Sequence, residues 1–319
     1  MCTTMTKSIK KLLKNKPLIV LLATSIVVAM LNPRFLTWGN IVTVLRQTSV
    51  NAVIATGMTF AILIGGIDLS VGSVLGFCGA IAATMISSGI NVFIVIIAAM
   101  LLGTLIGFLN GTLIAAGRLQ PFIATLGTVT LLRGLILVFT QGRPIRTGST
   151  GASEAFGKIG TGFIGPIPIP VYIMILVFIL SYYILNHTRI GRYIYATGSN
   201  EEATIYSGIK TSRVKLFVYS VSGMMAALAG ILITARLGSA QPTAGAGYEL
   251  DAIAAVVLGG TSMAGGIGTI AGTAIGALII GVLNNALNLM QVSSYYQDVA
   301  KGIVILAAVL LDRKQKLSR

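Results

Sequence analysis

The residues of this chain best suited to chemistry within an apolar setting lie in the string GGIDLSVG at residues 65–72. There, two uncharged stretches are interrupted by glycines and polar residues, namely Gly65, Gly66, Asp68, Ser70 and Gly72. An interrupted helix at membrane depth must find partners for its free N–H and C=O groups, so it is tolerated only against protein or a water-filled cavity. Asp68 could supply a partner by capping the following helix. The string predicts either a capped turn at the interface or a gate beside a transport pathway.

A second glycine-rich string, VVLGGTSMAGG at 256–266, partly repeats the first. When the two are aligned, three glycines of the first string coincide with glycines of the second, which contains Gly259, Gly260, Gly265 and Gly266. Paired glycine breaks in two halves of a chain are a sequence pointer to a transport site. We therefore expect both strings to flank the pathway. The predicted helix order puts them on the same side, which does not support an inverted repeat.

Amide and acidic side chains in other predicted spans are further candidates. Asn284 and Asn285 occur together in the string NNALN. Polar amides in a helix bundle bond neighbouring helices, and a hydroxyl-rich substrate could use the same groups. Glu249 and Asp251 open another span, where capping of the helix N-terminus is the preferred interpretation.

The patterns expected of an enzyme are missing from the sequence. The chain has one histidine, His187, and two cysteines, Cys2 and Cys78. A single histidine gives no nucleophile–base pair that can be credited, and neither G-x-x-x-x-G-K-[ST] nor H-E-x-x-H occurs. We expect no catalytic residue, no metal site and no ATP hydrolysis by this chain.

Composition places the chain among helical membrane proteins. Of its 319 residues, 55% are hydrophobic and only 10% are charged, whereas soluble domains carry about 25% charged residues. The apolar runs are continuous and approach the ~20 residues that cross a bilayer as a helix. The net charge of +15 is explained by basic residues at span ends, so nucleic acid is not an expected partner. The predicted fold class is an all-α integral membrane protein.

Apolar runs and their breakers predict about ten transmembrane helices, near 17–32, 50–64, 67–88, 91–116, 121–140, 171–186, 214–236, 249–262, 266–290 and 296–311. Fifteen of the 23 lysines and arginines lie at 1–16, at 187–215, in the tail or at Arg118. Basic residues favour the cytoplasm, so both termini are predicted to be cytoplasmic, as an even number of spans requires.

The predicted organisation has three parts. A basic cytoplasmic N-terminus (1–16) precedes one transmembrane domain (17–311), and a basic cytoplasmic tail (312–319) follows. Within the domain, 141–170 is an external loop and 187–213 a cytoplasmic loop. The basic start and first apolar run look like a signal peptide, but without a small-x-small cleavage site we expect an uncleaved first span.

The cytoplasmic loop contains a short potential helix. Asn200 can cap it, Glu201 and Glu202 lie in its first turn, and Gly208 can end it. A solvated loop helix needs no partner. A short charged helix between two spans is also a means of receiving force from a cytoplasmic motor.

Four strings together resemble the permease subunits of monosaccharide ABC importers, above all those that import ribose: GMTFAILIGGIDLSVGSVLG, QPFIATLGTVTLLRGL, HTRIGRYIYATGSNEEATIYSGI and QPTAGAGYELDAIAAVVLGGTSMAGG. The similarity covers the chain from about residue 35 to the tail. It implies an ABC importer permease fold in the bacterial inner membrane. It also implies a second copy of the chain, a cytoplasmic ABC ATPase that holds ATP and Mg²⁺, and a periplasmic sugar-binding protein.

The resemblance also assigns the 200–208 segment as the loop that docks on the ATPase. Its pattern departs from the usual E-A-A, three residues, Gly: Glu201 precedes Glu202 and Ala203, and four residues separate Ala203 from Gly208. The implied function is import of a monosaccharide, ribose in the first instance, by alternating access. The alternative is an ion-coupled secondary sugar carrier, which needs polar ion sites in broken helices.

Overall fold

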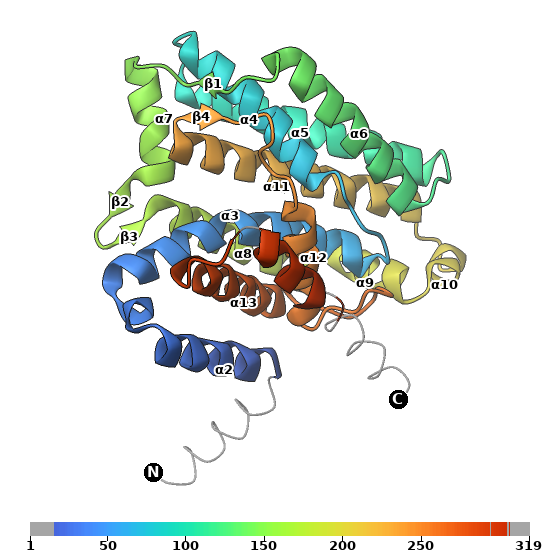
Figure 1. Ribbon diagram of the computed structural model, residues 1–319. Coiled ribbons are helices and arrows are strands. Elements are labelled where there is room, and N and C mark those ends of the chain that lie inside the picture. The colour runs from blue at the N-terminus through green and yellow to red at the C-terminus, as the bar shows by residue number, and fades with distance from the viewer. Residues whose placement is uncertain (1–15, 294, 305, 307–319) are drawn as a thin grey trace.

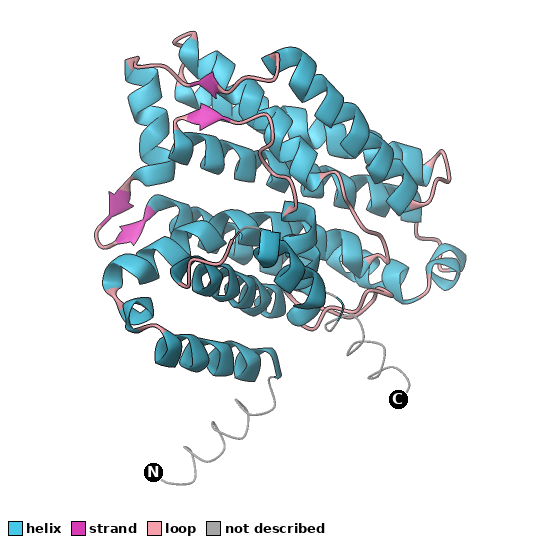
Figure 2. Ribbon diagram, in the orientation of Figure 1, coloured by secondary structure: helices cyan, strands magenta, loops and turns pink. Residues whose placement is uncertain are grey.

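The computed structural model describes residues 16–293, 295–304 and 306. The chain is helical almost throughout, with four two-residue strands (Figure 2). The elements are α2 (Lys16–Leu31), η1 (Pro33–Leu36), α3 (Trp38–Leu63), α4 (Val71–Ser87), α5 (Val92–Ala115), α6 (Pro121–Thr140), β1 (Ile145–Arg146), α7 (Gly151–Thr161), β2 (Phe163–Ile164), β3 (Ile167–Pro168), α8 (Ile169–His187), α9 (Arg189–Ser199), α10 (Glu201–Tyr206), α11 (Thr211–Leu237), β4 (Ser239–Ala240), α12 (Tyr248–Leu258) and α13 (Ile270–Leu289). Residues 295–304 are also helical.

Five of the described helices are long and apolar enough to cross a membrane, namely α5, α6, α8, α11 and α13. The helices α2 and α4 are apolar but shorter. The prediction of a helical, multi-spanning protein is confirmed at this level. Each of the five has bounds within three or four residues of its predicted run, because an uncharged run between glycines, prolines and charges defines a span locally.

The helix α3 begins much earlier than predicted. The apolar pattern predicts a span at 50–64, whereas the helix starts at Trp38 and includes Arg46. The guanidinium of Arg46 lies over the ring of Phe163, 5.0 Å from its centroid. This cation–π contact accommodates a charge that the apolar pattern treated as a boundary.

The centre of the molecule is formed by α3 and α11. Every residue from Thr48 to Leu63 is buried, and α11 packs against α5, α3 and α4. Glycines allow the closest of these contacts: a Cβ on Gly107 of α5 would lie 2.1 Å from the carbonyl oxygen of Tyr219, and one on Gly223 would lie 2.1 Å from that of Gly103. Small residues spaced by four let helix backbones approach in this way.

The helices form two packed layers (Figure 1), α4, α5, α6, α7 and α11 in one and α2, α3, α8, α12 and α13 in the other. Two antiparallel strand pairs, β1–β4 and β2–β3, lie at one end of the bundle. We call this the strand end. The helices α9 and α10 lie at the opposite end, which we call the α10 end. The segments 141–170 and 187–213 thus occupy opposite ends.

Candidate functional site

The string GGIDLSVG forms an interruption between α3 and α4. At the end of α3, the N–H groups of Gly65 and Gly66 donate to the carbonyl oxygens of Ile62 and Ala61, and Gly65 has a φ of 77°. A left-handed glycine with these bonds ends a helix and satisfies its last carbonyls. The chain then runs without helical structure until Val71.

Asp68 is fully buried in this interruption. Its Oδ1 accepts hydrogen bonds from the N–H and the Oγ of Ser70, at 3.0 and 2.5 Å. Its Oδ2 accepts one from the Oγ of Ser222 on α11, at 2.7 Å. The carboxylate therefore holds the residue that precedes α4 and ties it to α11. It bonds the backbone as expected of a cap, but at Ser70 rather than within the first turn of α4.

Ser70 extends this hydrogen-bond network to α5 and α6, which lie in the same layer as α4. The amide of Asn110 on α5 donates to the Oγ of Ser70 at 2.9 Å, and the hydroxyl of Thr128 on α6 donates to Asn110 at 2.5 Å. A chain of side-chain bonds thus joins α6, α5, the interruption and α11. Buried polar groups need such partners, because an unbonded one costs several kcal/mol in an apolar setting.

A second interruption lies between α11 and α12, at residues 238–247. Its carbonyl at Ala244 accepts a hydrogen bond of 2.7 Å from Arg133 on α6. This stretch meets the first: a Cβ on Gly72 would lie 2.2 Å from the carbonyl oxygen of Gly245 and 2.4 Å from Oε2 of Glu249. The beginnings of α4 and α12 are therefore in direct contact.

The helices that follow the two interruptions, α4 and α12, run in opposite directions. The helix α3 ends at the α10 end, since the carbonyl of Leu63 contacts α9, and α4 ends beside Gly148 near the strand end. The helix α11 ends at the strand end, where Gly238 bonds Thr147, and α12 runs back toward the α10 end (Figure 1). The helices α4 (17 residues) and α12 (11 residues) thus both start inside the bundle and run in opposite directions. The counterpart of 65–72 in this arrangement is 238–247, because each of these segments leads into a helix that starts inside the bundle. The string at 259–266 follows α12 instead.

The string GGTSMAGG follows α12 and lies at the α10 end. The N–H of Gly266 donates to the carbonyl of Leu63 at 2.9 Å, and a Cβ on Gly265 would lie 2.9 Å from the nitrogen of Gly65. The two glycine strings are therefore neighbours, and α9 completes the contact. The direct contact between the strings is at Gly65 and Gly265, whereas Gly72 packs against Gly245 and Gly259 against Gly272.

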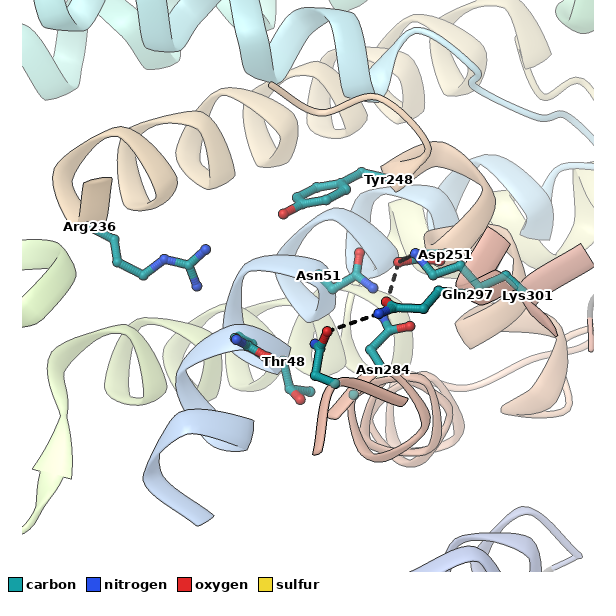
Figure 3. Close-up of a pocket in the computed structure, with 11 residues that line it drawn as sticks. Thr48, Asn51, Arg236, Tyr248, Asp251, Asn284, Gln297 and Lys301 are labelled. Atoms are coloured by element: carbon teal, nitrogen blue, oxygen red, sulfur yellow. Dashed lines mark hydrogen bonds and ion pairs between the residues drawn. The ribbon is translucent and has the colours of Figure 1, made fainter. Parts of the chain in front are cut away.

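A polar cavity of about 230 Å³ lies beside the second interruption (Figure 3). Its wall comes from α3, the end of α11, the start of α12, α13 and residues 295–304, and it includes Thr48, Asn51, Arg236, Tyr248, Asp251, Asn284 and Lys301. Ligand pockets for larger molecules span ~300–1,000 Å³, so this one suits a small ligand. Sequence reasoning missed Thr48, Arg236 and Tyr248 as lining residues.

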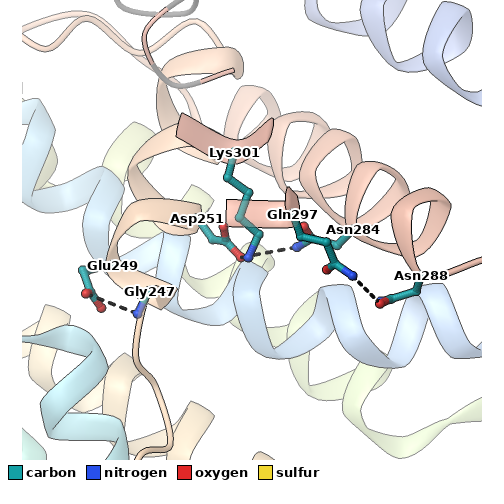
Figure 4. A network of polar contacts seen from close by, with 7 residues as sticks. All are labelled: Gly247, Glu249, Asp251, Asn284, Asn288, Gln297 and Lys301. Atoms are coloured by element: carbon teal, nitrogen blue, oxygen red, sulfur yellow. Dashed lines mark hydrogen bonds and ion pairs between the residues drawn. The ribbon is translucent and has the colours of Figure 1, made fainter. Parts of the chain in front are cut away.

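Two of the three charged residues that line this cavity, Asp251 and Lys301, form an ion pair (Figure 4). Oδ2 of Asp251 accepts from Nζ of Lys301 at 3.2 Å and from the amide of Asn284 at 3.3 Å. Glu249 accepts from the N–H of Gly247 at 3.3 Å, so it bonds the backbone at the start of α12 as predicted. Asp251, predicted as a cap as well, instead connects α12 to the last described helix.

The two asparagines of NNALN point to different environments. Asn284 lines the cavity. Asn285 is paired with Asn40 through two amide–amide hydrogen bonds of 2.8 and 3.0 Å. Of the two, only Asn284 remains a pathway candidate, because both polar ends of Asn285 are used in holding α3 against α13.

The α10 segment has the predicted local structure. Asn200 accepts from the N–H of Ala203 at 2.9 Å, and Gly208 ends the segment with a φ of 81°. Glu201 bonds Lys215 at 2.7 Å and Thr211 at 3.0 Å, which fixes α10 on α11. Glu202, Ile205 and Tyr206 are exposed, and Tyr206 has 90% of its surface accessible.

A second cavity, of about 620 Å³, opens beside α10. It is lined by residues from the end of α3, the α5–α6 connection and the start of α11, among them Gly65, Gly66, Gln120, Lys215 and Tyr219. The first interruption thus borders a wide cavity at the α10 end, while the second borders the smaller polar cavity.

Comparison with known proteins gives consistent matches. The family described as branched-chain amino acid transport system / permease component matches residues 40–309. The chain is 58% identical over 301 residues to the ribose import permease protein RbsC of Haemophilus influenzae, covering 94% of this chain and 93% of that protein. It is 54% identical over 305 residues to that of Escherichia coli K12 (96% and 95%) and 54% over 299 residues to that of Bacillus subtilis (94% and 92%). No solved structure matches.

These matches confirm the resemblance to importer permeases and do not favour an ion-coupled secondary carrier. The matched region contains both interruptions, both cavities and the α10 segment. The chain is therefore a multi-pass membrane transporter subunit that belongs to the branched-chain amino acid transport system / permease component family.

Proposed function

We propose that this chain is the permease subunit of an ATP-driven importer that carries ribose across the bacterial inner membrane by alternating access. The observation that carries the proposal is identity of 54–58% over more than nine-tenths of the chain to proteins named ribose import permeases. Coupling requires each ligand to favour one of two states of the permease. The helices α4 and α12, whose beginnings meet at Gly72 and Glu249, are the elements we expect to differ between those states.

We propose ten spans with both termini cytoplasmic. The α10 end then faces the cytoplasm, which agrees with the basic residues of its loop, and the strand end faces outward. The helices α4 and α12 count as spans that start within the bundle, each continued by its extended interruption. The basic N-terminus (1–16) lies outside the described residues except for Lys16, as does the tail (312–319), so their placement rests on charge alone.

The proposed partners are a second copy of the chain, a cytoplasmic ABC ATPase and a periplasmic sugar-binding protein. ATP and Mg²⁺ belong to the ATPase, and the chain itself binds no cofactor and no nucleic acid. The α10 segment supports the ATPase contact: Glu201 holds it on α11, while Glu202, Ile205 and Tyr206 project outward. Exposed aromatic and apolar side chains are enriched at the centre of protein interfaces and polar groups at the rim, so Ile205 and Tyr206 suit the centre of the contact and Glu202 its rim.

The test is reconstitution in vesicles. The chain with its ATPase and binding protein is expected to accumulate labelled ribose when ATP is supplied, and the chain alone is expected to accumulate none. Uptake by the chain alone under an ion gradient would contradict the proposal. Ribose transport that does not depend on ATP in the complete assembly would contradict it as well.

Tyr206→Ala is expected to weaken retention of the ATPase about tenfold or more, because an exposed tyrosine at the centre of an interface contributes ≥2 kcal/mol to binding in many complexes. Pull-down of the ATPase and ribose uptake should fall together. Tyr295→Ala is the control, since Tyr295 is similarly exposed at 85% but follows α13 at the strand end. Equal retention by both variants would contradict docking through α10.

A further inference from the structure

The polar cavity contains buried oxygen atoms with no hydrogen-bond partner in the described part of the chain. They are Thr48 Oγ1, Asn51 Oδ1, Asp251 Oδ1 and Asn284 Oδ1. All four residues line the same cavity. The exposed fractions of Thr48, Asn51 and Asp251 are 1%, 8% and 3%. Buried polar atoms without partners are rare in folded proteins, so four around one cavity require an explanation.

The chemical groups of the cavity wall limit which class of ligand can bind there. Oxygen acceptors dominate the unbonded atoms, which excludes an anion as the best partner. The charged residues of the wall are Arg236, Lys301 and Asp251; because Asp251 is paired with Lys301, the positive charge of Arg236 remains and disfavours a simple cation, since like charges repel at close range. A neutral molecule whose groups both donate and accept hydrogen bonds satisfies this mixture. Hydroxyl groups have this property, since each carries one donor and two acceptor lone pairs.

The geometry agrees with a ligand of this kind. The labelled side chains in Figure 3 come from opposite sides of the cavity, with Tyr248 and Arg236 across from Asn284. The cavity adjoins the start of α12, and the Asp251–Lys301 pair connects α12 to residues 295–304. A ligand bound here would contact α3, α12 and α13 together.

We propose that this cavity is a binding site for one neutral polyhydroxylated ligand, a monosaccharide, on its route through the permease. The inference rests on the proposed function and adds the location and the recognising groups. Thr48 and Asn51 on α3, and Asn284 on α13, accept hydrogen bonds from the hydroxyl groups of the sugar. Asp251 accepts one through Oδ1, while its Oδ2 stays bonded to Lys301. The second cavity, at the α10 end, then serves as the exit side.

The test measures ribose binding to the purified full chain by ligand-observed NMR, without ATPase or binding protein. Wild type is expected to bind ribose saturably in the millimolar range. Thr48→Val, which keeps the shape of the side chain, and Asn51→Leu are each expected to weaken binding five- to tenfold, tenfold being 1.4 kcal/mol. Thr56→Val is the matched control: Thr56 is a buried threonine of the same helix, but its hydroxyl bonds Ala52.

The outcomes separate this inference from the proposed function. Loss of binding in Thr48→Val and Asn51→Leu, with the thermal stability of wild type and normal binding in Thr56→Val, supports the site. Equal binding by all four proteins, or saturable binding of sodium or phosphate in place of ribose, overturns it. If the complete importer transports ribose while the isolated chain shows no binding, the cavity assignment fails and the proposed function stands.

Discussion

Replacement of Asp68 by leucine is expected to abolish ribose uptake and to lower the stability of the folded permease by several kcal/mol. The carboxylate accepts from the N–H and Oγ of Ser70 and from the Oγ of Ser222. Each donor left unbonded in a buried site costs ~1–3 kcal/mol. Leucine leaves these donors without an acceptor and removes the bond that holds the start of α4 to α11. Thermal unfolding of the purified protein and uptake by the reconstituted importer would measure both losses.

Asp68→Asn separates the hydrogen bonds from the charge. The side-chain oxygen of asparagine can accept from Ser70, and its amide can donate to the hydroxyl of Ser222, which rotates freely. We expect uptake within about threefold of wild type and stability within the ~0.5–1.5 kcal/mol typical of a net hydrogen bond. A folded Asp68→Asn protein without uptake would show that the charge itself acts in transport. A folded, active Asp68→Leu protein would refute the positioning role.

Gly198→Ala is expected to reduce uptake more than tenfold. Gly198 lies near the end of α9, and a Cβ there would be 1.7 Å from the carbonyl oxygen of Leu63 and 2.6 Å from the nitrogen of Gly266. Both contacts are backbone, which cannot move aside as a flexible side chain can. Overpacking of this kind costs ~1–3 kcal/mol or more. The substitution forces α9 away from the end of α3 and from the 259–266 string.

The contact at Gly198 is where α9, which leads into α10, meets both glycine strings, so we expect separation there to disconnect ATP hydrolysis from transport. The expected pattern is normal ATPase retention, continued hydrolysis and loss of uptake. Gly157→Ala on α7 is the control, because a Cβ at Gly157 meets nothing within 4 Å. Uptake by Gly198→Ala equal to that of the control would show that this junction does not transmit the motion.

The sequence was a good guide to whatever depends on neighbouring residues. Uncharged runs between breakers placed α5, α6, α8, α11 and α13 closely, because burial in lipid or protein requires a continuous apolar segment. The cap at Asn200 and the left-handed end at Gly208 were also predictable, since each is a bond or a dihedral within one turn of chain. The predicted start of α3 was wrong because Arg46 was treated as a boundary, whereas its charge is accommodated by Phe163 in a distant segment.

The sequence by itself thus determined the helical membrane class, most helix bounds and the family resemblance. Only the tertiary structure decided which interruptions are partners, which of Asn284 and Asn285 faces a cavity, and that Asp251 bonds Lys301. Asp68 bonds Ser222 across 154 positions, and Asp251 bonds Lys301 across 50. Apolar residues that face lipid and those that face protein look alike in a sequence. The packing of helices therefore cannot be inferred from hydropathy, and the polar sites exist only once that packing brings distant side chains together.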